Sequence, residues 1–235
     1  MCGIVGYVGE KQAANFLIDG LTKLEYRGYD SAGIAVFDGE KINVAKSVGR
    51  LAALKEKIKN NTPEGVMGIG HTRWATHGRP SDVNSHPHTD CSGKFAIVHN
   101  GIIENFMSLK EELIAKGHKF VSETDTEVVA HLIEDVYEGD FVEAVNKVLN
   151  RIEGSYSLAF MCQDYPDTLI CTKKDNPLVI GLGEGENFIA SDIPAIIAYT
   201  RRTYIMNDGE IAVVKKDSIW VTDRKGNPIT KKYLK

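Results

Sequence analysis

Twelve short strand-like runs, separated by turn residues, constrain the fold of this chain more than any other feature of its sequence. Several are joined by hairpin-length turns such as "DGEK", "GEGEN" and "NDGE", which favour antiparallel pairing of neighbouring strands. The number of runs predicts two antiparallel sheets. The runs occupy residues 3–9, 31–39, 41–47, 66–72, 94–101, 155–162, 168–174, 178–185, 187–192, 203–210, 211–216 and 218–223.

Segments with helical period are grouped between these runs and do not alternate with them. Apolar residues recur at helical spacing at Phe106, Leu109 and Leu113, and again within residues 129–136 and 141–152. Blocks of helices beside blocks of strands predict α+β layers. No repeat, low-complexity tract or Pro/Ser-rich linker divides the sequence, so we expect one domain over residues 1–235. The last 14 residues, "TDRKGNPITKKYLK", are polar and basic, and we expect them to leave the domain.

Charge and hydropathy exclude several classes of partner. The 235-residue chain has a formal net charge of -4, with Lys and Arg spread along it, which argues against a nucleic-acid partner. No apolar run is long enough to span a membrane, and the first residues do not match a signal peptide. We therefore expect a cytoplasmic protein, with reduced cysteines and a small-molecule ligand.

Cys2 is a candidate nucleophile because removal of Met1 would place a thiol and a free α-amine on one residue. An α-amine with a pKa of about 7.7–8.0 can accept the thiol proton and later return a proton to a leaving amine. Thr paired with its own terminal amine uses the same logic. The alternative is that Cys2 simply begins a buried strand. If Met1 stays attached, the amine is an amide, and we expect an inactive molecule.

Two further strings concentrate polar residues at strand ends. In "HTRWATHG", residues 71–78, Arg73 can hold a carboxylate through two hydrogen bonds, although a surface ion pair is the commoner role of a single arginine. Trp74 can close over a ligand, although a tryptophan is more often a core or interface residue. In "HNG", the amide of Asn100 and the backbone N–H of Gly101 can form an oxyanion hole. An Asn–Gly pair is first a turn signal, and the turn is the simpler interpretation.

The string "SETDTE", residues 122–127, offers a carboxylate that complements Arg73. Asp125 can receive a substrate ammonium group, and with Arg73 it would then hold the two ends of an amino acid. The structural alternative is a capping box, with Thr124 at the helix start and Glu127 three residues on, and with Asp125 in the first turn.

A cluster of histidines and one cysteine raises the question of a metal. The spacing matches no structural zinc pattern, and Cys91 has no evident base, so we expect neither a metal nor a cofactor. Cys162 and Cys171 lie in apolar runs and are expected to be buried. The cluster comprises His71, His77, His86, His88, Cys91 and His99.

Six strings together identify a family resemblance that covers nearly the whole chain. "MCGIVGYVG", "LEYRGYDSAGIAV", "HTRWATHG", "HNGIIENF", "SETDTEVVAHL" and "EGSYSLAF" resemble the glutaminase domain of the glutamine–fructose-6-phosphate aminotransferases, which are class II glutamine amidotransferases. The resemblance implies an N-terminal-nucleophile hydrolase fold, a four-layer αββα sandwich with two antiparallel sheets.

The resemblance also implies roles for individual residues. Cys2 would be the nucleophile that hydrolyses L-glutamine to glutamate and ammonia. The implied positions in this sequence are an oxyanion hole at Asn100 and Gly101, glutamine-binding residues Arg73, Thr76, His77 and Asp125, and a gate at Trp74.

The family's longer members carry a sugar-phosphate synthase domain that accepts ammonia onto fructose 6-phosphate, and no such domain is expected within residues 1–235. The chain should therefore hydrolyse glutamine without making glucosamine 6-phosphate. Three alternatives stay open: the glutaminase domain of another class II amidotransferase, a non-catalytic glutamine-binding module, and a metal-binding module built on the His/Cys cluster.

Overall fold

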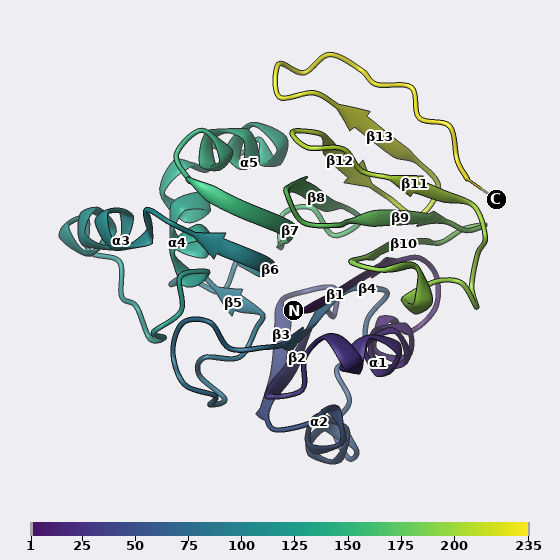
Figure 1. The fold of residues 1–235 in the computed structure, drawn as a ribbon, viewed down its shortest axis with the longest axis horizontal. Helices are drawn as coiled ribbons and strands as arrows, with labels where there is room; N and C mark the ends of the chain where they lie inside the picture. The colour runs from purple at the N-terminus through teal and green to yellow at the C-terminus, as the bar shows by residue number, and fades with distance from the viewer. Residues whose placement is uncertain (1, 235) are drawn as a thin grey trace.

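The computed structural model describes residues 2–234 and has four layers, with two antiparallel sheets packed between two layers of helices (Figure 1). The first sheet has the strand order β11 (Thr203–Ile205), β9 (Val179–Leu182), β10 (Asn187–Ala190), β1 (Gly3–Val8), β4 (Met67–Arg73), β2 (Ser31–Phe37) and β3 (Ile42–Val48). The second has the order β13 (Ile219–Thr222), β12 (Ile211–Val214), β8 (Leu169–Lys174), β7 (Gly154–Cys162), β6 (Phe95–Ile103) and β5 (His88–Thr89).

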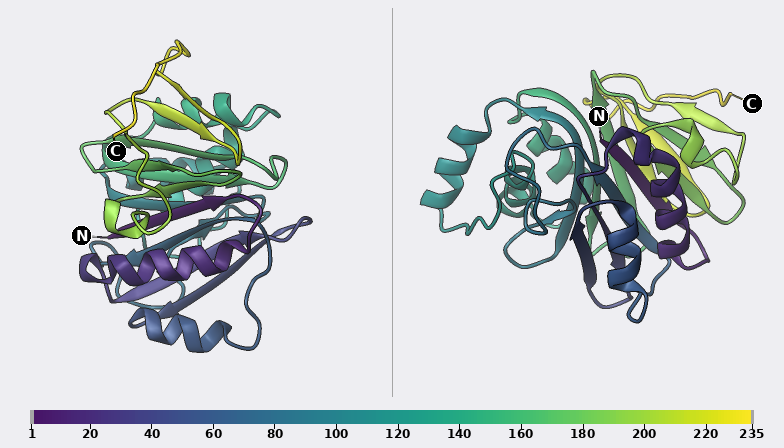
Figure 2. Two further views of the ribbon diagram at one scale, coloured as in Figure 1. Left: turned by 90° about the vertical axis from the view of Figure 1, so that its right-hand side faces the viewer. Right: turned by 60° about the horizontal axis from the view of Figure 1, so that its bottom comes forward.

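The helices cover the outer faces of the two sheets. Helices α1 (Ala13–Leu24) and α2 (Leu51–Ile58) pack on the first sheet, while α3 (Phe106–Ala115), α4 (Glu127–Val136) and α5 (Phe141–Leu149) pack on the second. Figure 2 shows the two groups of helices on opposite sides of the paired sheets.

Strand β1 is buried on both faces because it is a central strand of an inner layer. Successive side chains of a strand point to opposite faces. Ile4 and Val8 accordingly pack in the core between the two sheets, whereas Val5 and Tyr7 pack in the core beneath α1 and α2. Full burial of each such side chain stabilises the fold by about 1.5–3 kcal/mol. The strand that begins one residue after Cys2 is thus firmly anchored.

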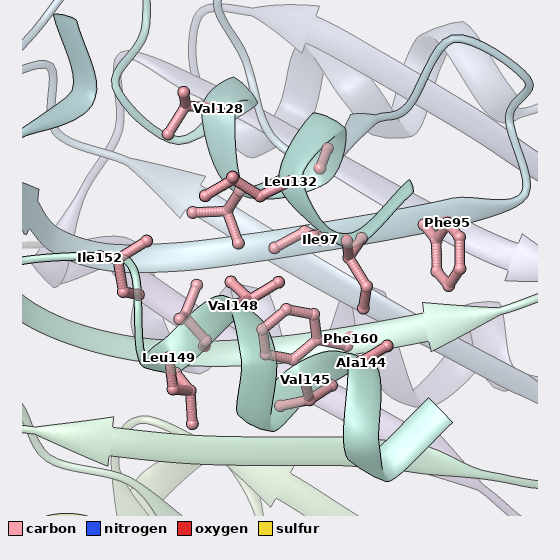
Figure 3. Packing of buried hydrophobic residues seen from close by; sticks show 14 of the residues in the cluster. Phe95, Ile97, Val128, Leu132, Ala144, Val145, Val148, Leu149, Ile152 and Phe160 are labelled. Atoms are coloured by element: carbon pink, nitrogen blue, oxygen red, sulfur yellow. The ribbon is translucent and has the colours of Figure 1, made fainter. Parts of the chain in front are cut away.

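The outer face of the second sheet is covered by apolar stripes on α4 and α5. On α5, Phe141, Ala144, Val145, Val148 and Leu149 are buried at helical spacing, and Asp140 begins the helix by accepting a hydrogen bond from the Glu143 N–H. Figure 3 shows four residues of this stripe, Ala144, Val145, Val148 and Leu149, together with Val128 and Leu132 of α4, packed near Ile97 of β6 and Phe160 of β7.

The predicted strands and the three predicted helices are confirmed, with bounds that shift by a few residues. Strand β5 and helices α1 and α2 were not predicted. Cys162 and Cys171 are buried, as expected.

Three local predictions are wrong. Asn100 and Gly101 do not form a turn, because β6 continues through them to Ile103. Thr124 does not begin α4, which has Thr126 at its N-cap and no side-chain capping bond. The C-terminal segment does not leave the domain: the Ile229 N–H donates to the Val221 carbonyl, and Leu234 pairs with Thr203 of β11.

Within residues 2–234, no helix combines the length and the apolar character needed to cross a membrane.

Candidate active site

Cys2 lies at one end of the central strands of the first sheet, where β1 begins and the neighbouring strand β4 ends. The antiparallel register pairs Gly3 with Thr72, which places Cys2 next to Arg73 and Trp74. The Trp74 N–H donates to the Cys2 Sγ at 3.2 Å, and the thiol lies 3.5 Å from the Trp74 carbonyl oxygen. The pairing of β1 with β4, and not proximity in sequence, therefore brings Cys2 next to residues 71–78.

The backbone of Cys2 is held by two side-chain donors. Its carbonyl oxygen accepts hydrogen bonds from Arg27 Nε at 3.0 Å and from Asn100 Nδ2 at 3.0 Å. Arg27 is buried and also forms an ion pair with Asp192, at 3.1 Å. This network fixes Cys2 between the two sheets, since Arg27 follows α1 while Asn100 belongs to β6.

Seven of the eight predicted site residues line one small cavity, which has a volume of about 20 Å³ and opens to solvent. An adjoining cavity, lined by Asn100 and Ile102 among others, shares Cys2, Trp74, Thr76 and Gly101 with it. All eight residues therefore meet around the Cys2 thiol. The first cavity is lined by Cys2, Arg73, Trp74, Thr76, His77, His86, His99, Gly101, Thr124, Asp125 and Thr126.

Two buried side chains of opposite charge face this cavity. Arg73 Nη2 donates to the carbonyl oxygens of His77 and Gly78, the latter at 2.8 Å. Its Nη1 is buried and has no hydrogen-bond partner among residues 2–234. Asp125 Oδ2 accepts from the Ile103 N–H at 2.7 Å. A buried guanidinium nitrogen without a partner is costly, so this geometry favours an anionic ligand group at Arg73.

Gly101 is required at its position by both conformation and space. Its φ of +121° is a conformation that side-chain-bearing residues rarely adopt, and a Cβ there would lie 2.2 Å from the Ser155 carbonyl oxygen. The backbone of β6 thus passes close to β7 beside Cys2. A cavity wall without a side chain lets a ligand approach the backbone closely.

Three buried histidines lie at the cavity, two of them in its lining, and all three are neutral at pH 7. Burial lowers the pKa of His71 to about 3 and also lowers the pKa of His86 and His99. His71 Nε2 lies 2.9 Å from the His99 carbonyl oxygen and 3.0 Å from Asn100 Oδ1. Both partners are acceptors, so Nε2 carries the proton, and this bond turns the NH₂ group of Asn100 toward Cys2.

Burial raises the pKa of the Cys2 thiol, and the carboxylate of Asp30 raises it further. The thiol is therefore protonated at pH 7 and needs a base before it can act as a nucleophile. The buried histidines are poor candidates because burial disfavours their protonated form and so makes them weak bases. Met1 lies outside the described residues, so the free α-amine of Cys2 stays a prediction.

Trp74 is 48% exposed, and its ring makes an edge-on contact with Tyr29, with centroids 5.4 Å apart. His77 contacts Phe106 in a similar way, at 5.4 Å. Thr76 is exposed on the same loop. The loop after β4 therefore forms an accessible wall of the cavity.

Arg27 and Asp30 were not predicted from residue chemistry. Asp30 accepts a hydrogen bond from the Ala75 N–H, and its own N–H donates to the Arg73 carbonyl at 3.1 Å, so it holds the loop after β4. Both residues belong to the string "YRGYD", whose Gly28 lies so close to Arg73 that a Cβ would be 2.7 Å from its carbonyl carbon. In the sequence, the charged residues on either side of Gly28 were the signal that could have identified Arg27 and Asp30 as site residues.

The six-residue His/Cys cluster of the sequence is divided in the structure. His71 and His86 stack in the buried interior, with ring centroids 4.0 Å apart, and His88 contacts His86 edge-on, with centroids 4.8 Å apart. Cys91 is exposed and lies elsewhere, 3.5 Å from His131 Nδ1. The expectation that Cys91 has no neighbouring base is therefore wrong.

Comparisons with known proteins agree with this geometry. A family model described as "Glutamine amidotransferase domain" matches residues 71–198, more than half of the chain. The chain is 59% identical, over 98% of its length, to the glutamine–fructose-6-phosphate aminotransferase (isomerizing) of Caldanaerobacter subterraneus subsp. tengcongensis, and covers 38% of it. It is 50% identical, over 100% of its length, to the protein of the same name from Thermus thermophilus, and covers 39% of it. The chain thus spans about two fifths of the length of these relatives.

Solved structures show the same fold. The glutamine phosphoribosylpyrophosphate amidotransferase of B. subtilis superposes with a TM-score of 0.83 and 27% identity, over 97% of this chain and 50% of that one. A glutamine aminotransferase class-II domain protein from Silicibacter pomeroyi superposes with a TM-score of 0.64 and 14% identity, over 94% and 99%. Together with the two antiparallel sheets between helical layers, these likenesses confirm the predicted α+β N-terminal-nucleophile hydrolase sandwich.

Proposed function

The chain belongs to the glutamine amidotransferase domain family, and from this premise we propose that it releases ammonia from the side-chain amide of L-glutamine, with the Cys2 thiol as nucleophile. The observation that carries the proposal is the cavity itself. It places a thiol beside an unpartnered buried guanidinium nitrogen of Arg73 and a buried carboxylate of Asp125. An amino acid whose side chain ends in an amide matches these three features.

Binding is proposed to use both charges. Arg73 Nη1 would receive the α-carboxylate of glutamine, and Asp125 would receive its α-ammonium group. Thr76 and His77, which line the same cavity, would enclose the aliphatic part. With its α-groups fixed in this way, the substrate directs its side-chain amide toward Cys2.

The reaction is proposed to pass through two steps of acyl transfer. The Cys2 thiolate attacks the amide carbon, and the Asn100 amide and the Gly101 N–H stabilise the oxyanion. The C–N bond breaks, and ammonia leaves with a proton from the α-ammonium of a Met-free Cys2. Water, deprotonated by the same amine, then hydrolyses the thioester, so that glutamine and water give glutamate and ammonia.

The destination of the ammonia is a further part of the proposal. The curated relatives are named for transfer of an amino group from glutamine to fructose 6-phosphate. We assign this chain the ammonia-supplying role in such a transfer. The exposed indole of Trp74, which lines both cavities next to Cys2, is suited to gate the passage of ammonia.

The nucleophile is tested by covalent labelling. We expect the glutamine analogue diazo-oxo-norleucine to add one label per chain, and peptide mapping to place it on a Met-free Cys2, because only this thiol adjoins the proposed amino-acid cavity. Intact mass before and after treatment measures both processing and labelling. Cys91 is the other thiol with clear exposure, and it should stay unmodified at equimolar reagent.

The outcomes of this experiment separate the alternatives. A Met-free chain that takes no label contradicts the nucleophile and points to a non-catalytic binding module. A labelled chain that retains Met1 contradicts the proposed role of the free α-amine.

The ammonium contact is tested by changing Asp125 to Asn. The amide can still accept from the Ile103 N–H but loses the negative charge, so we expect kcat/KM for glutamine to fall roughly 10- to 150-fold, the equivalent of a charged hydrogen bond of about 1.5–3 kcal/mol. The loss should appear mainly in KM, because this contact is the same in the ground and transition states.

Glu123→Gln is the matched control for Asp125. It removes a carboxylate from the same loop, but the Glu123 side chain faces Asn84, at 3.0 Å, and not the cavity. Its kinetics should equal those of the unchanged chain. Equal effects of the two substitutions would mean that the overall negative charge of the loop, and not a direct contact with Asp125, attracts the ammonium group.

A further inference from the structure

A second group of reactive side chains lies outside the cavity, on the far side of the loop that carries Asp125. Cys91 belongs to the turn between β5 and β6, His118 follows α3, and His131 and Glu134 lie three residues apart on α4. Residues at this helical spacing share one face. Three separate segments of the chain therefore contribute to one cluster, which we call the Cys91 cluster.

The ligand atoms of the Cys91 cluster are spaced like the corners of a tetrahedral metal site. All four lie within 4.8 Å of one another. The two Nδ1 atoms are 3.3 Å apart, the Cys91 Sγ is 3.5 Å from His131 Nδ1 and 4.0 Å from His118 Nδ1, and His118 Nδ1 is 3.0 Å from a Glu134 oxygen. Tetrahedral zinc with bonds of about 2.0–2.3 Å separates its ligand atoms by about 3.3–3.6 Å.

The outward-facing nitrogen of His131 is within hydrogen-bond distance of a carboxylate, and that of His118 points to a carboxylate slightly farther away. His131 Nε2 lies 3.3 Å from Glu127 Oε1, and His118 Nε2 lies 3.8 Å from Asp135 Oδ1. Metal-ligating histidines typically donate this second N–H to a carboxylate, which leaves the other nitrogen free to bind the ion.

Without a cation, this arrangement brings lone pairs together. If both Nε2 atoms carry their protons toward carboxylates, both Nδ1 atoms and the Glu134 oxygen present lone pairs to the centre of the cluster. The Glu134 oxygen accepts from the Cys91 N–H at 3.2 Å, but the Cys91 thiol has one proton and can satisfy only one of the two Nδ1 atoms. A divalent ion would bind all of them, and with one thiolate and one carboxylate the site would have no net charge.

We propose that Cys91, His118, His131 and Glu134 bind one Zn²⁺ ion. Mixed sulfur, nitrogen and oxygen ligands in tetrahedral spacing suit zinc, and four protein ligands make a closed structural site. This departs from the expectation, drawn from sequence spacing, that the chain holds no metal. Apart from His131 and Glu134, the ligands are separated by long intervals of sequence, so they form no recognisable metal-binding motif.

The site is placed where a bound ion would stabilise the loop that leads to Asp125. Glu127, which contacts His131, also accepts hydrogen bonds from the N–H groups of Val121 and Ser122, at 2.8 Å and 2.7 Å. These residues begin the loop that leads to Asp125. An ion at the Cys91 cluster would fasten the turn before β6 and the segment after α3 to α4, and would thereby stabilise this loop.

The test uses the whole chain, stripped with a chelator and then titrated with zinc alone and with cobalt alone. We expect one bound zinc per chain by elemental analysis. Cobalt should give the intense visible bands of tetrahedral coordination and a thiolate charge-transfer band in the near ultraviolet. Zinc at about one hundred times its Kd should raise the unfolding midpoint by about 5–10 °C.

Variants locate the ion. Cys91→Ser should abolish the charge-transfer band, and His118→Ala and Glu134→Gln should each weaken zinc binding at least tenfold. Cys2→Ser, which removes the thiol of the cavity, should bind zinc as the unchanged chain does. Cys91 is exposed, so we expect Cys91→Ser to fold. If it does not, Glu134→Gln, a conservative change on helix α4, still tests the site.

Two results would overturn the proposal. One is a folded, chelator-stripped chain that binds no zinc at micromolar free metal. The other is zinc binding that survives unchanged in Cys91→Ser, His118→Ala and Glu134→Gln, since the ion would then lie elsewhere.

Discussion

Replacing Cys2 with alanine is expected to lower kcat for glutamine hydrolysis by about 10⁴- to 10⁶-fold, the range seen when a member of a nucleophilic catalytic group is removed. The reason is that no other thiol lines the cavity among residues 2–234. The loss would fall on chemistry alone, because Arg73 and Asp125 keep the proposed amino-acid contacts. An ammonia-release assay measures it.

Binding provides the control for Cys2→Ala. Calorimetric titration should show that the variant binds glutamine with an affinity within a few-fold of that of Cys2→Ser. Among residues 2–234 the thiol makes two polar contacts, both to the backbone of Trp74, so its removal should not unfold the domain. Turnover by Cys2→Ala within tenfold of the unchanged chain would eliminate Cys2 as the nucleophile.

The sheets were predictable from sequence because period-two apolar runs and hairpin turns report directly on local structure. Helix α1 was not predicted, and its packing explains why. Gly20 lies on its buried face, where a Cβ would be 2.9 Å from the Val5 side chain. A close approach of helix to sheet selects glycine at that position, and glycine weakens the helical signal in the sequence.

The start of α4 shows how tertiary contacts override a local motif. The spacing of Thr124 and Glu127 predicted a capping box. In the structure, Glu127 bonds instead to Ser122 and His131, while Thr124 Oγ1 lies 2.9 Å from His88 Nε2. His88, from a distant segment, competes for the Thr124 side chain, while His131, one turn further along α4, and Ser122 compete for Glu127. The contact with His88 depends on the assembled fold, so the local motif does not indicate it.

The candidate site was predictable where residue type alone indicates chemistry. A terminal thiol, an arginine and an aspartate each suggest a role, and the sheet registers bring them together. Arg27 acts on Cys2 only through a hydrogen bond across 25 positions of sequence, and His71 acts only by orienting Asn100. Such supporting contacts depend on the assembled fold, so residue type alone did not indicate these roles.

Replacing Asn100 with alanine is expected to lower kcat by about 10²- to 10³-fold, which corresponds to the loss of one oxyanion-hole donor worth about 2.7–4 kcal/mol. The Asn100 NH₂ group already lies at Cys2, where it donates to the carbonyl oxygen at 3.0 Å. It has a second N–H for the oxyanion that forms when the Cys2 thiolate attacks. The contact strengthens as charge develops, so kcat and kcat/KM should fall together while glutamine binding changes little.

Asn100→Asp sharpens this test because it keeps the shape of the side chain. A carboxylate cannot donate to the oxyanion and repels it, so turnover should fall at least as far as in Asn100→Ala. Asn43→Ala is the matched control, since that amide contacts only Asp38 on an exposed hairpin, at 2.6 Å. Stopped assays of ammonia release over a range of glutamine concentrations give kcat and KM separately. Wild-type turnover in Asn100→Ala would remove Asn100 from the oxyanion hole, and a rise in KM alone would make it a binding residue, because only a contact formed in the transition state lowers kcat without weakening substrate binding.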